Sequence, residues 1–308
     1  MESKTSRPII HNFKRPFAFF AVFAAIGIWR YIATGGVFYL LIFGYIGFSI
    51  ALGAYLSETL SDAKKPWGRR ITQLLVGLFM LGFLGFLANE NMQMEGFFFY
   101  AAAGIFGGAT LHYVIAKVVG PLHFGRGWCG WGCWTAMILD FMPWKVPARP
   151  RLKYWSGLRY VHFVVSAGLV LGLIFLYDYG PAEHSAAEFT WLLYGNAAYY
   201  VIAILLAAFL KDNRAFCKYV CPIPVTMKIT SRFSLMKQQI DMDECTDCGE
   251  CEENCPMDIQ LLEYARREQR VLSTECVLCD TCVYVCPVDA IKTTKRFDVC
   301  TREFINVG

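Results

Sequence analysis

The sequence predicts two kinds of structure in one chain: an all-α membrane domain of six transmembrane helices, then a small α+β domain rich in cysteine. The 308 residues are 56% hydrophobic and only 18% charged, with a mean hydropathy of +0.39, which is too apolar for an ordinary soluble domain. Six apolar stretches have about the length that a bilayer requires. Eight cysteines lie in the last quarter, in two runs of one spacing. We place the two domains at residues 1–230 and 231–308.

The charge differs in sign between these two parts. Residues 231–308 contain fifteen acidic and nine basic residues, whereas the rest of the chain contains ten acidic and twenty basic ones. The basic residues gather at the ends of the apolar stretches and form no continuous stripe. We therefore expect a basic membrane part joined to an acidic cytosolic part, and no binding of nucleic acid.

Each apolar stretch is expected to form one membrane span. The first follows a basic segment without a small-residue cleavage site, so we expect it to be retained and not removed as a signal peptide. Only Gly35 and Gly36 separate the first two, which predicts a tight hairpin. The closely spaced glycines of the third and fourth stretches, such as Gly82 with Gly85 and Gly104 with Gly108, are expected to serve close helix packing. The six stretches are residues 17–34, 37–56, 71–88, 97–117, 158–177 and 191–210.

The loops between the stretches predict the orientation. Residues 89–96 and 178–190 contain acidic residues but no Lys or Arg, whereas the loops on the other side are basic. By the positive-inside rule, both termini are cytoplasmic in a multi-pass protein of the inner (cytoplasmic) membrane. The basic side chains on that side include Lys4, Arg7, Lys14, Arg15, Lys64, Lys65, Arg69, Arg70, Arg126, Lys145, Arg149, Arg151, Lys153, Lys211, Arg214 and Lys218.

The cysteine runs of the tail both read C-x2-C-x2-C-x3-C, and Pro256 or Pro287 follows the last cysteine. In bacterial-type ferredoxins this run holds two [4Fe-4S] clusters, and the fourth cysteine of each run ligates the other cluster. A disulfide or zinc module is disfavoured, because zinc sites usually pair C-x2-C with a distant second pair. The clusters need reduced thiols and hence a cytosolic location. Carried over by spacing, one cluster takes Cys245, Cys248, Cys251 and Cys286, and the other takes Cys276, Cys279, Cys282 and Cys255.

Two further cysteine pairs precede the tail, and their surroundings repeat. Arg126-x-Trp-Cys129-x-Trp-x-Cys133 matches Arg214-x-Phe-Cys217-x-Tyr-x-Cys221 at an offset of 88 residues. The same offset carries the third apolar stretch onto the fifth. We therefore expect helices 3–4 and helices 5–6 to be an internal parallel repeat, with its axis along the membrane normal.

This repeat predicts a shared site at the cytoplasmic edge of the membrane. If the pairs are helical, cysteines four residues apart lie on one face. Two such faces would bring together Cys129, Cys133, Cys217 and Cys221. Four thiolates suit an iron–sulfur cluster, zinc or Cu(I). A redox-active thiol pair, and ordinary cysteines among the aromatic residues of a membrane boundary, are the alternatives.

Weaker signals come from two histidines. His112 in the fourth stretch and His162 in the fifth are candidates for quinone contacts, since histidines inside a membrane are uncommon and often functional. Haem b ligation is less favoured, and hydrogen-bonded core residues are the ordinary alternative. The sequence has no C-x2-C-H motif, so covalent c-type haem is not expected. Cys300 belongs to no motif, and we expect a free structural thiol there.

Together these motifs resemble the NapH/NosR-type membrane polyferredoxins. The resemblance covers the chain from about Ile71 onward, and the shorter NapH-like architecture, without a flavin domain, fits better. Cys217-Lys-Tyr-Val-Cys221-Pro222 follows the family pattern, whereas Trp134 stands after Cys133 where Pro is usual. The resemblance implies electron transfer between a membrane quinone pool and soluble or membrane redox partners, usually as one subunit of a complex.

We therefore expect an electron-transfer subunit of an oxidoreductase complex, in contact with the lipid bilayer, the quinone pool and a redox partner or soluble electron carrier. An accessory or regulatory protein for assembly, copper reduction or redox sensing of another membrane complex is the alternative. A transporter scaffold with an attached ferredoxin is less favoured, because the sequence shows no sign of the broken helices that transporters use.

Overall fold

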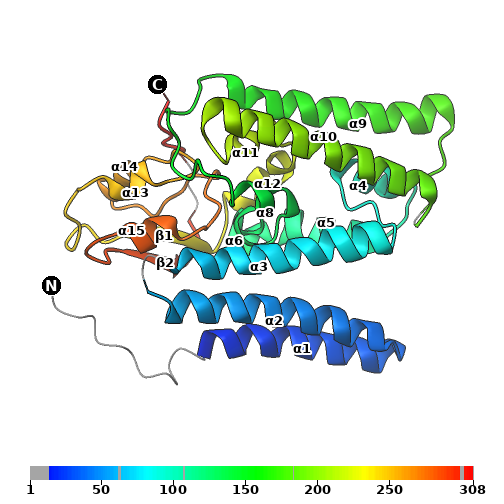
Figure 1. Cartoon of the computed structure of the whole chain (residues 1–308), viewed down its shortest axis with the longest axis horizontal. Helices are drawn as coiled ribbons and strands as arrows, with labels where there is room; N and C mark the ends of the chain where they lie inside the picture. Colours follow the sequence, from blue (N-terminus) through cyan, green and yellow to red (C-terminus); the bar gives the residue numbers. More distant parts are fainter. Residues whose placement is uncertain (1–13, 62–63, 107, 183, 299–301, 308) are drawn as a thin grey trace. The chain divides into compact units, whose positions relative to one another are not determined.

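The computed structural model describes residues 14–61, 64–106, 108–182, 184–298 and 302–307, so Cys300 lies outside the described residues. The chain divides into two compact units, Met1–Val76 and Gly77–Gly308, and its described part is mostly helical (Figure 1). Helices η3 and η4 are π-helices and η5 is a 3-10 turn. The elements are α1 (Lys14–Thr34), α2 (Val37–Thr59), α3 (Pro66–Leu78), η3 (Phe79–Leu87), α4 (Met94–Ala102), α5 (Gly108–Tyr113), η4 (Val114–Val119), α6 (Pro121–Phe124), α7 (Gly127–Trp131), α8 (Trp134–Leu139), η5 (Trp155–Gly157), α9 (Leu158–Tyr177), α10 (Ala186–Leu210), α11 (Ala215–Tyr219), α12 (Ile223–Ser231), β1 (Met236–Ile240), α13 (Glu250–Glu253), α14 (Leu261–Ala265), α15 (Thr281–Val285) and β2 (Ile291–Lys295).

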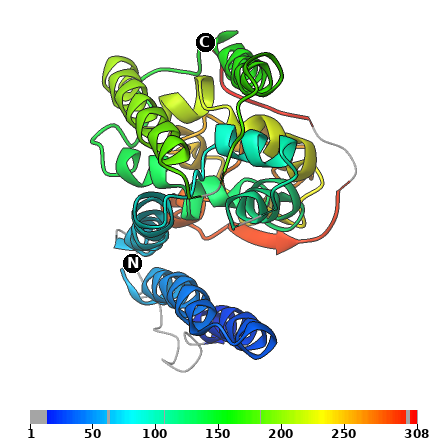
Figure 2. The same cartoon turned by 90° about the vertical axis from the view of Figure 1, so that its right-hand side faces the viewer.

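In the first unit, α1 and α2 form the expected hairpin and lie side by side (Figures 1 and 2). Gly35 reverses the chain with a φ of +69°, which glycine adopts without steric cost. Its N–H donates to the carbonyl of Tyr31 over 2.7 Å. Further along, the Thr72 hydroxyl donates to the Ser49 carbonyl of α2 over 3.3 Å, so small polar residues join α2 to the start of α3.

Among the described residues, five helices are long and apolar enough to cross a membrane: Pro16–Thr34, Val37–Thr59, Pro66–Leu87, Trp155–Tyr177 and Ala186–Leu210. Their outward side chains are strongly apolar. Leu176 of α9 is 81% exposed and Phe209 of α10 is 78% exposed. Apolar surface of this extent is unusual on a soluble monomer. The five helices are compatible with a multi-pass membrane protein.

The fourth predicted span is not one helix in the structure. After the nine residues of α4 the chain leaves the helix, and Gly104 takes a left-handed φ of +70° before α5 begins. Nine residues of α-helix extend only about 14 Å, which is less than half of a bilayer core. The expectation that Gly104 serves helix packing is also wrong, because a Cβ there would meet nothing within 4 Å. At Gly85 the packing expectation holds, since a Cβ would lie 2.9 Å from Leu192 of α10, but at its partner Gly82 a Cβ would meet nothing within 4 Å.

The second unit contains the helices that follow Gly77 together with the cysteine-rich tail. Helix α4 packs against α9 and α10. The tail contributes one antiparallel sheet, in which β1 pairs with β2 from Met236 opposite Lys295 to Ile240 opposite Ile291. Figure 1 shows the tail elements α13–α15 at one end of the long helices α9 and α10 of this unit.

The core of the tail continues beyond the tail. It includes residues such as Leu261, Val271 and Val277, but also Cys129 of α7 and Met227 of α12. Helices α7 and α12 precede residue 231, so apolar packing runs across the division that we placed between the two domains. The cysteine pair at Cys129 is thereby held against the cysteine runs.

Candidate iron–sulfur centres

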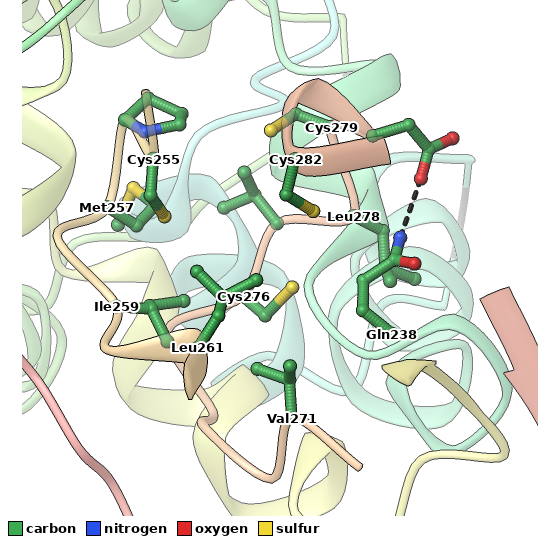
Figure 3. A pocket seen from close by; sticks show the side chains of 13 residues that line it. Gln238, Cys255, Met257, Ile259, Leu261, Val271, Cys276, Leu278, Cys279 and Cys282 are labelled. Atoms are coloured by element: carbon green, nitrogen blue, oxygen red, sulfur yellow. Dashed lines mark hydrogen bonds between the residues drawn. The ribbon is translucent and has the colours of Figure 1, made fainter. Parts of the chain in front are cut away.

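Four cysteines from both tail runs surround one cavity. Cys255 comes from the first run, and Cys276, Cys279 and Cys282 come from the second. In Figure 3 their sulfur atoms point toward the same space. Non-glycine residues with left-handed backbone curl the loop between the cysteines, with φ +48° at Leu278 and +57° at Asp280. The rest of the lining is mainly apolar, and includes Met257, Ile259, Leu261 and Val271.

The chemistry of this cavity suits a cluster. Burial raises the pKa of the Cys255 and Cys276 thiols to about 12, so without iron these groups keep their protons at neutral pH. A positively charged metal would replace those protons, which is how thiolate sites couple binding to deprotonation. The apolar lining excludes water, which is one of the factors that set cluster potentials. In the described part of the chain, no three His, Cys, Asp or Glu side chains have the arrangement of a preformed metal site. The argument for a cluster here therefore depends on the four cysteines that line one apolar cavity.

The other four tail cysteines differ in their exposure. Cys251 on α13 is buried and Cys248 is exposed. Burial raises the pKa of Cys251 to about 12, with Glu252 and then the neighbouring Cys245 and Cys248 adding to the shift. The N–H of Asp247 donates to Cys245 Sγ over 3.4 Å, a contact of the type that tunes cluster potentials. Cys286 packs against the same core.

The two C-x3-C pairs have the same local structure. Cys129 lies on α7 and Cys217 on α11, two helices of five residues each. The N–H of Cys133 donates to the Trp128 carbonyl over 3.1 Å, and that of Cys221 donates to the Phe216 carbonyl over 2.9 Å. The second cysteine of each pair lies just beyond its short helix. The expected arrangement of both cysteines on one helical face is therefore wrong in detail.

The thiols of the two pairs influence one another's pKa. Burial raises the pKa of Cys133 to about 12, and charge on Cys129 and Cys217 raises it further. Burial likewise raises the pKa of Cys221, where Cys217, Cys133 and Cys129 contribute next. Such mutual effects are strongest in a low-dielectric interior. The two distant segments thus share one electrostatic environment, in which Cys129 and Cys217 are buried and Cys133 and Cys221 are half-buried.

Helix α7 contacts the cysteine loop of the second run directly. The Trp131 indole Nε1 donates to the Leu278 carbonyl over 2.8 Å. A Cβ on Gly130 would lie 2.2 Å from the Val277 carbonyl oxygen, so only glycine allows this approach. The C-x3-C site and the cavity of Figure 3 therefore share a wall.

The two arginines of the repeated pattern have different partners. Arg214 donates to Asp140 over 2.6 Å and to the Cys129 carbonyl over 3.0 Å. Arg126 donates to Glu275, the residue before Cys276, over 2.7 Å. Arg214 thus joins the two cysteine pairs to each other, and Arg126 joins the first pair to the tail.

Glu275 is a site residue that no sequence motif predicted. Its buried carboxylate lies between four cations. Burial alone would raise the pKa of this carboxyl, but the cations hold it well below the usual range. The distances are 2.7 Å to Arg126, 2.7 Å to Arg159, 2.9 Å to Lys228 and 3.3 Å to Arg151.

The two histidines lie in different surroundings. His112 packs edge-on against Trp128, with 4.8 Å between ring centroids, and its buried Nε2 has no hydrogen-bond partner among the described residues. His162 Nδ1 donates to the Val220 carbonyl over 2.9 Å, and its Nε2 lies 3.5 Å from the Tyr199 hydroxyl. Within the described part of the chain no contact joins the two histidines.

Comparison with known proteins identifies the segments that hold these cysteines. A family model described as a 4Fe-4S dicluster domain matches residues 237–287, which contain both tail runs. A model described as a 4Fe-4S binding domain matches residues 106–153 and 199–240, which contain the two C-x3-C pairs. No solved structure matches the chain significantly.

The curated relatives are similar over part of the chain. Protein MJ0749 of Methanocaldococcus jannaschii is 28% identical over 52% of this chain and 64% of its own length. The methylamine utilization ferredoxin-type protein MauN of Paracoccus denitrificans is 27% identical over 58% of this chain and 63% of its own length. The putative electron transport protein YccM of Escherichia coli is 37% identical over 20% of this chain and 17% of its own length.

The chain therefore spans less than two thirds of the length of these relatives. Ferredoxin-type segments match in both the tail and the C-x3-C regions, and relatives are named as ferredoxin-type and electron transport proteins. The NapH/NosR assignment stays a prediction. The chain therefore contains 4Fe-4S ferredoxin-type segments, and its apolar helices are compatible with a membrane location.

Proposed function

We propose that the chain is a membrane-bound electron-transfer subunit that carries electrons between the cytosolic side and a site of four cysteines at the membrane edge. Two [4Fe-4S] clusters supply the one-electron carriers of the tail. The ligands we assign are Cys245, Cys248, Cys251 and Cys286 for one cluster, and Cys276, Cys279, Cys282 and Cys255 for the other.

The direct contact between α7 and the second cysteine run carries this proposal. Gly130 and Trp131 lie against Val277 and Leu278 with no other segment between them. Electron transfer needs such close approach. If the tail served only to bind a soluble partner, the close contact of Gly130 with the second cysteine run would have no evident purpose.

At the membrane edge we propose a third iron–sulfur cluster, held by Cys129, Cys133, Cys217 and Cys221. The match of a 4Fe-4S binding model to both segments supports iron over zinc or Cu(I). The buried guanidinium of Arg214, 4.0 Å from Cys217 Sγ, offsets part of the negative charge that four thiolates would bring.

The exposed end of the tail is the proposed docking surface for a redox partner or soluble electron carrier. Cys248 is exposed, and six exposed carboxylates surround the first run: Asp241, Asp243, Glu244, Asp247, Glu250 and Glu253. Acidic patches of this kind steer basic partners and act mainly on the association rate.

We further propose the inner membrane, with both termini cytoplasmic, and a quinone contact at His162. Its Nδ1 donates to Val220, next to Cys221, so Nε2 is left to face the Tyr199 hydroxyl. A hydroxyl and an imidazole beside the proposed cluster could exchange protons with a quinone. His112, packed against Trp128, is the weaker candidate.

An accessory role in assembly, copper reduction or redox sensing remains the second candidate. It predicts labile Cu(I) at the four membrane-edge cysteines and no stoichiometric redox partner. The broken helix at Gly104 is a feature that transporters use, but the named relatives favour electron transfer.

Iron and sulfide counts on anaerobically purified full-length protein, together with EPR spectra, test the proposal. Three clusters predict about twelve irons per chain, and the tail alone predicts about eight. Cys279→Ser should remove one tail cluster, while Cys300→Ser, outside every motif, should leave iron unchanged. About eight irons in the unmodified protein would refute the third cluster, and bound copper would favour the accessory role.

A further inference from the structure

A second cavity lies beside the buried Glu275, outside the proposed cluster sites. Its volume is about 130 Å³, well above the 10–15 Å³ or so that one water needs. Its wall is formed by the segment before α9, by α12 and by the C-terminal segment. The backbone of Arg151 forms a parallel β-bridge with Val307, and its N–H donates to the Asn306 carbonyl over 3.0 Å. These backbone contacts join the segment before α9 to the C-terminal segment.

The lining of this cavity carries an excess of positive charge. Four cations, Arg151, Lys153, Arg159 and Lys228, face only two carboxylates, Glu275 and Glu303. Glu275 is also bonded to Arg126, so its single charge is shared by four buried or half-buried cations. Burying unpaired positive charge is costly unless an anion compensates it.

Two of the arginines have hydrogen-bond donors left over. Arg151 is 3% exposed and Arg159 is fully buried, yet Arg151 Nη1 and Arg159 Nε have no acceptor among the described residues. Their other nitrogens are used by Glu275 and by the Lys218 carbonyl. Buried donors are nearly always paired in native proteins, so an acceptor from outside the chain is the expected partner.

The position of the cavity indicates which acceptor this is. Its lining includes Tyr154, 81% exposed, and Tyr160, 47% exposed, and it lies where the candidate span Trp155–Tyr177 begins. Exposed aromatic side chains at the end of a span are typical of the headgroup level of a bilayer. Basic pockets at that level bind the headgroups of anionic lipids.

We propose that this cavity binds the phosphate group of an anionic phospholipid, through Arg151 and Arg159 inside and Lys153 at the mouth. The lipid would brace the first residues of α9 against the C-terminal segment and Glu275. Such a lipid site is separate from the proposed electron transfer and can be tested without it.

The test is lipid binding to the full-length protein, delipidated in mild detergent and followed by native mass spectrometry and thermal unfolding. We expect phosphatidylglycerol to bind at least about tenfold more tightly than phosphatidylcholine. Arg151→Gln should weaken phosphatidylglycerol binding about tenfold, since a charge-assisted bond to phosphate is lost. Lys153→Gln, on an exposed side chain, should weaken it about threefold. Arg149→Gln removes an exposed charge of the same loop outside the cavity and should change it less than about twofold.

Three results would overturn the proposal. Equal binding of the two lipids would remove the role of lipid charge, and an equal loss in Arg149→Gln and Arg151→Gln would reduce the effect to general surface attraction. Inorganic phosphate that protects as well as phosphatidylglycerol would assign the cavity to a soluble anion. Iron content monitors folding of each variant, and Lys153→Gln keeps the test decisive if Arg151→Gln does not fold.

Discussion

Glu275 is the residue on which several buried charges depend. Its carboxylate is 1% exposed and accepts from Arg126 and Arg159 at 2.7 Å each. Glu275→Gln would leave these cations without their counter-charge, and removing one partner of a buried pair typically costs about 3–5 kcal/mol. We expect lower thermal stability and loss of iron from the second run, since Cys276 is the next residue. Thermal unfolding and iron analysis measure both effects.

Glu263→Gln is the matched control for this substitution. Glu263 is 39% exposed and lies 3.4 Å from the half-exposed Arg266. Exposed pairs contribute about 0–1 kcal/mol, so this variant should resemble the unmodified protein. Similar losses in the two variants would mean that the cations around Glu275 do not depend on it.

At the scale of elements, the contact between α7 and the cysteine loop makes Gly130 intolerant of a larger side chain. A Cβ there would lie 2.2 Å from a backbone oxygen of Val277, so Gly130→Ala must push the two segments apart. Overpacking of this kind costs about 1–3 kcal/mol. We expect a lower unfolding temperature and a changed EPR signal from the second run. Gly168→Ala on α9, where a Cβ meets nothing within 4 Å, is the control and should alter neither.

The break between α4 and α5 predicts the sign of another substitution. Gly104 has a φ of +70°, where alanine costs roughly 1–2 kcal/mol. Gly104→Ala should therefore lower the unfolding temperature. In an unbroken helix over residues 97–117, the same change would stabilise by about 0.5–1 kcal/mol. A raised unfolding temperature would therefore support the continuous helix that the sequence predicts. Gly82→Ala, where a Cβ also meets nothing within 4 Å, gives the change in unfolding temperature to compare with.

The elements also show what the sequence could and could not predict. Five spans follow from apolar length, because a helix that meets lipid needs little else. The break at Gly104 was missed because a glycine that packs and a glycine that turns look alike in a sequence. Arg126 pairs with Glu275, which lies 149 positions further along the chain, and no local sequence pattern predicts such a contact. The cysteine spacings do predict the cluster ligands, because most ligands of one cluster come from a single short segment.

At the scale of the whole molecule, the four C-x3-C cysteines lie in one of the two matched ferredoxin-type segments, between the long helices and the tail. A double variant, Cys129→Ser and Cys217→Ser, removes one thiol from each pair and leaves the tail runs intact. We expect the iron count to fall by about four while the tail EPR signals persist. Electron transfer from a soluble reductant to a quinone, measured in reconstituted vesicles, should fall at least about tenfold, since even changes beside a metal ligand can cost that much.

Cys300→Ser carries the same chemical change outside the runs and the pairs, and should leave both the iron count and the rate unchanged. If the double variant loses iron but keeps its rate of electron transfer, metal binding at the four cysteines is supported and their role in electron transfer is not. The four cysteines would then hold a metal that electrons do not use, and the contact of Trp131 with Leu278 would be a structural brace. If instead the rate falls with the iron, we infer that this contact lies on the path between the tail and the four C-x3-C cysteines, because Gly130 and Trp131 lie directly against the loop at Val277.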